Sequence, residues 1–322
     1  MKILFDGLGG DNSPQEIVKG AILAKNELGI EIAIIGNKEE INKILLEENA
    51  EAEVIHADEK IENDEQPAFA IKNKKNSSIV LGLKALAMDK YDAFVSAGST
   101  GALLAGGLFI VKRIPNIKRA VIPTPIPTIK GSVCVIDSGA NMDTDPELLL
   151  QFAKMGNEYV KTAFSIENPR IGLLNVGTEA GKGNELTKET FKLLANTKLN
   201  FVGNVEARDI AFDVCDVLIC DGFVGNVLLK TTEGIAGFYN YLLKEKVIKN
   251  MSKEGQVEFV KNYEQIKKRL DYKEIGGATL LGLNKIVVKA HGSSNAMAIK
   301  NAAKNALDSF NGKIIENMKN CF

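Results

Sequence analysis

The sequence predicts an α/β fold in which a mainly parallel sheet is covered by helices on both faces. Short apolar runs rich in Ile, Val and Leu alternate with segments of helical periodicity, a pattern typical of repeated strand–helix–strand units. The runs contain few polar residues, which favours strands that are buried on both faces. At 322 residues with 45% hydrophobic side chains, the chain can bury a large core. The predicted strands cover residues 2–5, 31–35, 91–96, 120–122, 132–137, 170–175, 217–220 and 285–289.

The helices between these strands carry their own signals. Apolar residues recur on one helical face between Ile17 and Leu28. Asp145 and Pro146 supply an N-cap and a first-turn proline, which predict a helix over residues 148–159.

Two stretches depart from this alternation. Residues 113–131 contain four prolines, which predict an extended crossing segment rather than a regular element. Residues 239–272 are rich in Lys and Glu, and no strand is predicted after them until residue 285. We therefore predict a helical protrusion at about 239–272 on a single α/β domain that spans residues 1–322. Its lysines suit an acidic carrier protein or anionic lipid, and a solvated helical pair that builds a dimer is an equal alternative.

Composition narrows the possible functions. The formal net charge is −1, so nucleic acid is not an implied partner. The four cysteines have no CxxC spacing and the chain has only two histidines, which leaves few parts for a metal site or a Ser-His-Asp triad. The chain enters a strand directly after Met1 without a signal-peptide pattern, and this predicts cytoplasmic residence.

Five Gly-rich polar loops follow predicted strands. Because ligands of open parallel sheets bind at the carboxyl ends of the strands, we expect these loops to converge on one rim. Glycine lets backbone N–H groups approach an anion, and a following helix N-terminus favours negative charge. Neither GxxxxGK[ST] nor GxGxxG occurs, so no cofactor is predicted and phosphate is the favoured ligand. The loops are 6–13 (DGLGGDNS), 94–101 (FVSAGSTG), 135–141 (VIDSGAN), 173–184 (LLNVGTEAGKGN) and 218–226 (LICDGFVGN).

Several loop side chains suit the same role. Lys182 lies between two glycines, where a lysine has little packing purpose and can reach an anion. Asparagines in or near the loops can donate to a carbonyl or phosphate oxygen, although Asn also tolerates turn conformations. Aspartates beside them can orient these donors or cap helices. These residues are Asn141, Asn184, Asn204 and Asn226, and Asp11, Asp137 and Asp221.

His291 lies in a Gly/Ser turn, residues 289–295 (KAHGSSN), between a strand and the last predicted helix. Its small polar neighbours suit an anion, while a lone histidine is as often structural as functional.

Eight motifs in chain order resemble the PlsX family of phosphate acyltransferases. Each motif is weakly specific by itself, but the set is highly specific and spans nearly the whole chain. Two residues depart from the usual family pattern: Leu8 stands in place of methionine, and Ser99 in place of asparagine. The motifs are 6–11 (DGLGGD), 96–102 (SAGSTGA), 137–141 (DSGAN), 173–186 (LLNVGTEAGKGNEL), 201–209 (FVGNVEARD), 221–230 (DGFVGNVLLK), 276–282 (GGATLLG) and 290–295 (AHGSSN).

The resemblance implies an enzyme that makes acyl phosphate from acyl-[acyl carrier protein] and orthophosphate for phospholipid synthesis. It also implies a fold like that of the isocitrate and isopropylmalate dehydrogenases, a homodimer, attachment to the inner face of the membrane, and a glycerol-3-phosphate acyltransferase as a partner. We predict catalytic roles for Lys182, Asn184, Asn226 and His291. The phosphate- or substrate-binding set is Gly9, Gly10, Asp11, Gly98, Ser99, Thr100, Gly101, Asp137, Asn141, Asn204, Gly225 and Ser293.

Three other functions compete with this interpretation. The related fold and three aspartates, Asp213, Asp216 and Asp221, suggest a metal-dependent decarboxylating dehydrogenase, but the first and last lie too far apart along an extended chain to share one ion easily. A phosphotransacetylase that uses acyl-coenzyme A differs only in its thioester donor. A docking scaffold without catalysis is disfavoured by five polar loops at strand ends.

Overall fold

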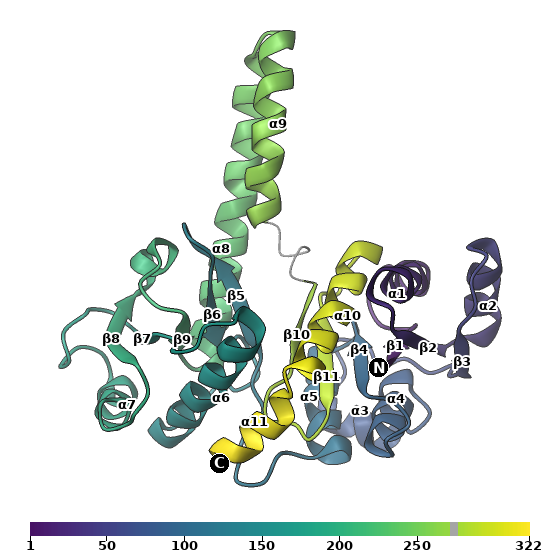
Figure 1. The fold of residues 1–322 in the computed structure, drawn as a ribbon, viewed down its shortest axis with the longest axis horizontal. Helices are drawn as coiled ribbons and strands as arrows, with labels where there is room; N and C mark the ends of the chain where they lie inside the picture. The colour runs from purple at the N-terminus through teal and green to yellow at the C-terminus, as the bar shows by residue number, and fades with distance from the viewer. Residues whose placement is uncertain (271–275) are drawn as a thin grey trace.

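Two sheets form the body of the protein (Figure 1). The computed structural model describes residues 1–270 and 276–322, apart from the side chains at 258, 262 and 264–270. The first sheet has the order β10-β11-β4-β1-β2-β3 and the second the order β5-β6-β9-β7-β8. The first comprises β1 (Lys2–Asp6), β2 (Glu31–Gly36), β3 (Glu53–His56), β4 (Ala93–Ser96), β10 (Gly277–Thr279) and β11 (Ile286–Ala290). The second comprises β5 (Pro123–Pro127), β6 (Ser132–Ile136), β7 (Ile171–Asn175), β8 (Phe201–Glu206) and β9 (Val217–Ile219).

Helices cover both sheets. The α-helices are α1 (Gln15–Leu28), α2 (Lys38–Glu47), α3 (Pro67–Asn73), α4 (Ser78–Ala87), α5 (Thr100–Gly106), α6 (Pro146–Phe164), α7 (Glu185–Ala195), α8 (Gly222–Leu242), α9 (Lys253–Leu270), α10 (Ala296–Asn311) and α11 (Ile314–Cys321). The shorter π and 3₁₀ turns are η1 (Gly107–Val111), η2 (Ala207–Phe212), η3 (Leu243–Val247) and η4 (Ile248–Asn250). The expected N-cap of α6 is present, because the Asp145 carboxylate accepts from the N–H of Leu148 at 2.8 Å.

The predicted mainly parallel sheet with helices on both faces is confirmed, with one difference. The strands divide between two sheets, and β5 and β10, each at the end of its sheet, run antiparallel to their neighbours. The side chains of β1 show why both faces are covered. Ile3 and Phe5 pack in one buried cluster with residues of α1 and α10, while Leu4 points to the other face and packs with residues of α4.

The proline-rich stretch contains a strand that sequence patterning placed wrongly. No strand forms at residues 120–122, and β5 instead begins at Pro123 and pairs with β6 along its whole length. Proline cannot donate to a neighbouring strand, which restricts it to edge strands. Pro123, Pro125 and Pro127 alternate, so their missing N–H groups all face the outer edge, away from β6.

The predicted helical protrusion is formed by α8 and α9, which rise together above the body (Figure 1). The helix that leads into it starts earlier than the predicted stretch, because α8 begins at Gly222 within the body. Residues 271 and 272, at the end of the predicted stretch, lie outside the described part of the chain. Among the described helices, none combines the length and the apolar character needed to cross a membrane.

Candidate active-site cleft

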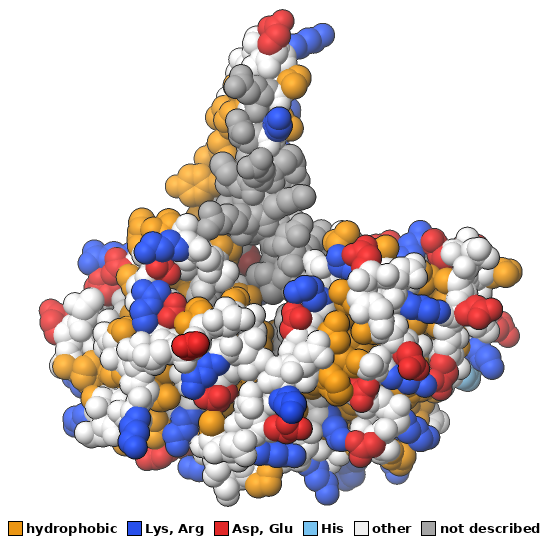
Figure 2. All heavy atoms as spheres, in the orientation of Figure 1, with side chains coloured by type: hydrophobic (Ala, Val, Ile, Leu, Met, Phe, Trp, Pro, Cys, Tyr) orange, Lys and Arg blue, Asp and Glu red, His pale blue; other side chains and the backbone are white. Residues whose placement is uncertain are grey.

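A cleft of about 790 Å³ opens where the two sheets meet at the foot of the protrusion. Its lining draws on the loops that follow β4, β6 and β11, on the edge strands β5 and β10, and on α8. Three of the five predicted loops therefore contribute directly, through Ala97 and Gly98, through Ser138 and Gly139, and through Asn226. Figure 2, in the orientation of Figure 1, shows basic and acidic side chains intermingled over the body.

One face of α8 forms a continuous wall of the cleft. The lining residues recur every three or four positions, which is the spacing of a single helical face. The stripe is polar near the start of the helix, where Lys230 pairs with Glu233 at 2.7 Å, and lacks charged side chains farther along. Its members are Asn226, Leu229, Lys230, Thr232, Glu233, Ala236, Gly237, Tyr239 and Asn240, followed by Leu243 of η3.

Asp137 organises the loop after β6. The side chain is fully buried, and its carboxylate accepts from the backbone N–H groups of Ile122, Ala140 and Asn141 at 2.7–3.2 Å. It also accepts from the side-chain amide of Asn141 at 3.0 Å. Burial raises the pKa of this carboxyl, and the hydrogen bonds oppose that rise. Both predicted residues therefore position the loop that carries Ser138 and Gly139 into the cleft.

Gly225 allows α8 to approach this loop. A methyl group built on Gly225 would overlap the carbonyl oxygen of Asp137, so only glycine fits. The close approach places Asn226 over Gly139, where an added carbon would lie 3.4 Å from the Asn226 amide nitrogen. Asp221 caps the same helix by accepting from the N–H of Val224 at 2.9 Å.

The first sheet contributes a buried polar group behind the cleft. The Ser96 hydroxyl donates to the Asp6 carboxylate at 2.6 Å and accepts from the Gly98 N–H at 3.0 Å. Burial raises the pKa of Asp6, and its hydrogen bonds, led by the one from Ser96, oppose that rise. Gly9 packs against this group, since an added methyl would lie 2.7 Å from both the Asp6 carboxylate and the Gly98 nitrogen. Ser96 thus holds the Gly98 segment at the cleft.

The loop over residues 6–13 lies behind the cleft rather than in its lining. The Asp11 N–H donates to the Gly292 carbonyl at 2.8 Å, and the Asn12 amide reaches the Ser294 carbonyl at 3.3 Å. Gly10 has a φ of 94°, a conformation that favours glycine. Gly9, Gly10 and Asp11 therefore support the turn that carries His291.

The turn after β4 begins α5. The Ser99 hydroxyl accepts from the Ala102 N–H at 3.4 Å, which is an N-cap. Thr100 lines the cleft. Gly101 packs directly onto Pro67, where any side chain would overlap the proline ring.

Lys289 is a cleft residue that sequence patterning missed. It lies on β11 and lines the cleft, and its ammonium group donates to the carbonyls of Ala97, at 3.2 Å, and Ala290. Burial lowers the pKa of Lys289 to about 8, and the charges of Asp6 and Asp11 oppose this. In the sequence, a lysine within an apolar strand indicates a half-exposed residue at the edge of a sheet. The structure shows instead that β11 pairs with β4, which places Lys289 beside the loop after β4.

His291 also lines the cleft. Its Nδ1 accepts from the Ser293 N–H at 3.2 Å and lies 3.0 Å from the Ser293 hydroxyl. Burial, followed by the charges of Lys230 and Lys289, lowers the pKa of His291. The imidazole is therefore neutral near pH 7, with its ring proton on Nε2.

Three predicted site residues neither line the cleft nor support a loop that lines it. Lys182 is exposed on the loop after β7, where its N–H donates to the Glu179 carbonyl at 3.0 Å. Asn184 caps α7 by accepting from Thr187 N–H at 3.0 Å, and the buried Asn204 amide donates to Glu179 carbonyl at 2.9 Å. In the second sheet, β7 lies beyond β9 from β6, which explains this separation.

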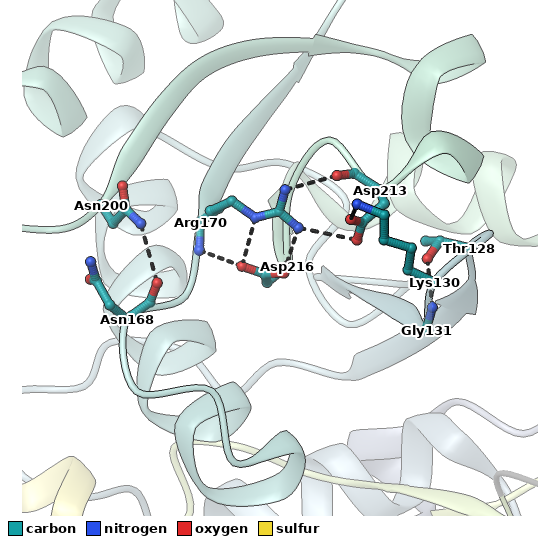
Figure 3. Close-up of polar contacts among 8 residues, drawn as sticks. All are labelled: Thr128, Lys130, Gly131, Asn168, Arg170, Asn200, Asp213 and Asp216. Carbon is teal, nitrogen blue, oxygen red and sulfur yellow. Dashed lines mark hydrogen bonds and ion pairs between the residues drawn. The ribbon is translucent and has the colours of Figure 1, made fainter.

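Two of the three aspartates behind the dehydrogenase alternative form an ion-pair cluster (Figure 3). The Arg170 guanidinium donates to both oxygens of Asp216, at 2.8 and 3.1 Å, and to the Asp213 carboxylate at 3.1 Å. Lys130 pairs with Asp213 at 3.3 Å. Among the described residues, no group of three or more His, Cys, Asp or Glu is arranged to hold a metal. The cluster ties the loop before β9 to the start of β7 and serves stability.

We expect Asp216→Asn to lower the free energy of unfolding at pH 7 by about 2 kcal/mol, between the values for exposed and buried pairs. Although burial raises the pKa of Asp216, its bonds with Arg170 leave it below the usual value. The stabilisation is therefore present above the unfolded pKa of about 3.9 and is lost as the pH falls through the folded pKa. Urea titrations should show the wild type and the variant converging below about pH 4. Lys130→Met, at an exposed partner of Asp213, is the control and should cost under about 0.5 kcal/mol; equal losses would contradict the assignment.

Comparison with known proteins places the chain in a family. A family model described as fatty acid synthesis protein matches residues 1–317. A phosphate acyltransferase of Caldanaerobacter subterraneus is 48% identical over 321 residues, covering 99% of this chain and 96% of the relative. One of Clostridioides difficile is 44% identical over 323 residues, covering 99% and 95%.

Solved structures share the fold at low sequence identity. A phosphotransacetylase from Streptococcus pyogenes matches with a TM-score of 0.66 and 21% identity, covering 98% of this chain and 94% of that one. A Salmonella typhimurium protein described as a candidate 4-hydroxythreonine-4-phosphate dehydrogenase matches with a TM-score of 0.55 and 13% identity, covering 95% and 98%. The expected dehydrogenase-like fold is confirmed in this sense. Because the family model and these curated relatives extend over nearly the whole sequence, the chain belongs to the PlsX family of phosphate acyltransferases, which transfer acyl groups in fatty-acid and lipid synthesis.

Proposed function

We propose that the protein transfers the acyl group of an acyl-[acyl carrier protein] to orthophosphate, as a step toward phosphatidic acid. The observation that carries the proposal is the composition of one end of the cleft. There Lys289, Asn226 and His291 line the same space as Gly98 and Gly139. Ammonium, amide and backbone N–H groups are the donors that hold an oxyanion and stabilise a tetrahedral intermediate.

The reaction needs little acid–base help. A phosphate oxygen attacks the thioester carbonyl, the tetrahedral oxyanion collapses, the C–S bond breaks, and acyl phosphate and a thiolate leave. Phosphate is largely dianionic near neutral pH, and the leaving thiol has a pKa of about 8.5 by analogy with cysteine. Catalysis then rests on holding phosphate against the carbonyl and on stabilising the developing charge. A neutral His291 with a proton on Nε2 fits a donor in this scheme.

Roles follow from position in the cleft. We assign Lys289 and the Gly98–Thr100 segment to phosphate, and Asn226 to the thioester oxygen, with His291 and Ser293 as secondary contacts. Asp137, Asn141, Gly225, Gly9, Gly10 and Asp11 support the loops that carry these groups. We assign Lys182, on the glycine-flanked loop after β7, as a second cation that reaches the substrate from outside the cleft lining. Asn184 and Asn204 hold that loop and the helix that follows it.

Lys182→Ala is expected to lower acyl-phosphate formation at least tenfold and to leave the melting temperature unchanged, because Lys182 is exposed and packs little. Lys188→Ala, on the first turns of the adjoining α7, is the matched control and should retain full activity. Turnover of the Lys182 variant within twofold of the wild type would remove Lys182 from the site.

The reaction is tested by incubating the purified protein with an acyl carrier thioester and phosphate. Acyl phosphate, trapped as the hydroxamate, and free thiol should appear in equal amounts and only when phosphate is present. The same acyl chain on coenzyme A tests the phosphotransacetylase alternative. A higher kcat/KM with coenzyme A would replace the proposed donor, and release of thiol without acyl phosphate would reject the reaction itself.

We further propose that α8 and α9 pair with those of a second copy and that the protein attaches to the inner membrane face beside a glycerol-3-phosphate acyltransferase. Ile235, Phe238 and Tyr241 on α8 are 52–60% exposed, and hydrophobic side chains gather along the protrusion (Figure 2). Such exposed apolar stripes favour association. Sedimentation of the protein at micromolar concentration should give the mass of a dimer, and the protein should co-sediment with anionic vesicles. A monomeric mass would reject the pairing of two copies, and failure to bind the vesicles would reject attachment to the membrane.

A further inference from the structure

The cleft continues well beyond its polar end. Past Glu233, the part of the wall formed by α8 and η3 consists of Ala236, Gly237, Tyr239, Asn240 and Leu243, none of which is charged. The opposite wall is the edge strand β5, whose three alternating prolines also line the space. We call this part of the cleft the corridor.

We propose that the corridor binds the alkyl chain of the acyl thioester, laid along α8 from the polar end toward Leu243. The inference rests on the proposed function, since the polar end is where the thioester carbonyl is placed. From the thioester carbonyl, the alkyl chain must extend along some surface of the protein. The corridor and the polar end belong to the same cleft, so the corridor offers such a surface.

The length of the corridor suits a membrane-lipid chain. A helix rises 1.5 Å per residue, so the corridor wall from Glu233 to Leu243 extends about 15 Å. Half of a bilayer's hydrocarbon core, which is the depth of one acyl chain, is about 15 Å. The corridor therefore has room for the whole chain.

The chemistry of the walls favours an alkyl chain over the carrier arm of the thioester. That arm contains amide groups, which need hydrogen-bond partners when they leave water. Pro123, Pro125 and Pro127 have no N–H to offer. An alkyl chain needs no partners and gains from contact with Tyr239, which is 60% exposed.

Gly237 marks the middle of the corridor and allows a direct test. A carbon added to Gly237 would meet no atom within 4 Å, so a larger side chain fits on the helix and fills the corridor instead. Gly234 lies on the same helix with equally open surroundings, but it does not line the cleft. The pair Gly237→Leu and Gly234→Leu is therefore matched in residue type and helix. Gly234 lies on the face of α8 that carries Phe238 and Tyr241, so the oligomeric state of both variants is measured as well.

We expect Gly237→Leu to shorten the preferred acyl chain. Full-length variants are assayed for acyl phosphate with thioesters of four to eighteen carbons on one carrier. Each buried methylene contributes about fourfold to affinity, so exclusion of three of them lowers kcat/KM for the longest chains about 60-fold. Four-carbon donors should stay within twofold of the wild type, and Gly234→Leu should keep the wild-type profile.

Other outcomes would overturn the proposal. If Gly237→Leu lowered kcat/KM equally for all acyl-chain lengths, the corridor would be assigned to the carrier arm instead. An unchanged profile would mean that no chain lies there, and a variant that changes only its oligomeric state would assign the surface to a second copy.

Binding of a fluorescent long-chain fatty acid, displaced by palmitate, separates this inference from the proposed reaction. Weakening of at least tenfold in Gly237→Leu alone, in a protein without turnover, would support the corridor and reject the reaction. Equal binding by both variants would reject the corridor.

Discussion

Replacement of Lys289 by Gln is expected to lower kcat/KM for phosphate by 10²–10³-fold, the usual effect of removing one preorganised donor from a site of developing negative charge. An ammonium group has three N–H donors, and Lys289 uses two of them on the carbonyls of Ala97 and Ala290. The third is then available to an oxyanion in the cleft. Gln keeps a donor for a backbone carbonyl, so the fold should persist, while the positive charge is lost.

The pH dependence of kcat/KM for phosphate tests the role of Lys289 a second time. Burial lowers the pKa of Lys289 to about 8, and the ammonium form is the one that binds phosphate. In the wild type, kcat/KM for phosphate should therefore fall about tenfold per unit above about pH 8. The carboxylates of Asp6 and Asp11 oppose the effect of burial on this pKa, because they favour the charged form. In Lys289→Gln this alkaline limb should disappear.

Lys285→Gln is the matched control for Lys289→Gln. It makes the same substitution next to the start of β11, where Lys285 pairs with Asp89 instead of lining the cleft. Its kinetics should stay within twofold of the wild type. If Lys289→Gln left kcat/KM unchanged and the melting temperature lowered, Lys289 would be a structural residue that only bridges β11 and the loop after β4.

Much of the fold was predictable because burial leaves a direct trace in sequence. Strands such as β1 and β7 are buried on both faces and therefore read as continuous apolar runs. The division into two sheets was not predictable, because the strand order of β11 beside β4 joins residues that are nearly 200 positions apart. The strand β5 was predicted at the wrong residues, because proline disfavours strands in general and only tertiary contacts show which strand lies at the edge of a sheet.

The site was predictable in part for a related reason. The predicted loops over residues 94–101, 135–141 and 218–226 carry glycine, two of them also asparagine, and follow apolar strands, so their common edge could be inferred. Lys289 gave no such signal, since it lies within a strand. Asn184 and Asp221 show the opposite difficulty, because an N-cap and a ligand-binding residue have the same sequence pattern.

Gly225→Ala is expected to lower the free energy of unfolding by about 3 kcal/mol, at the upper end of the range for overpacking in a rigid site. The added methyl would overlap the Asp137 carbonyl oxygen, and Cys220 Sγ lies only 3.0 Å away. Since both neighbours are buried, the helix itself must move.

Gly234→Ala on the same helix should have the opposite sign. No atom lies within 4 Å of its added carbon, so only helix propensity changes, and alanine should stabilise α8 by about 1 kcal/mol. Urea unfolding of both variants measures the difference directly. Movement of α8 would also lift Asn226 from Gly139, so the folded fraction of Gly225→Ala should show a lower kcat. Because Asn226 is assigned to the oxyanion, a Gly225→Ala protein that is destabilised yet fully active per folded molecule would show that the fit of α8 against Asp137 serves the fold alone.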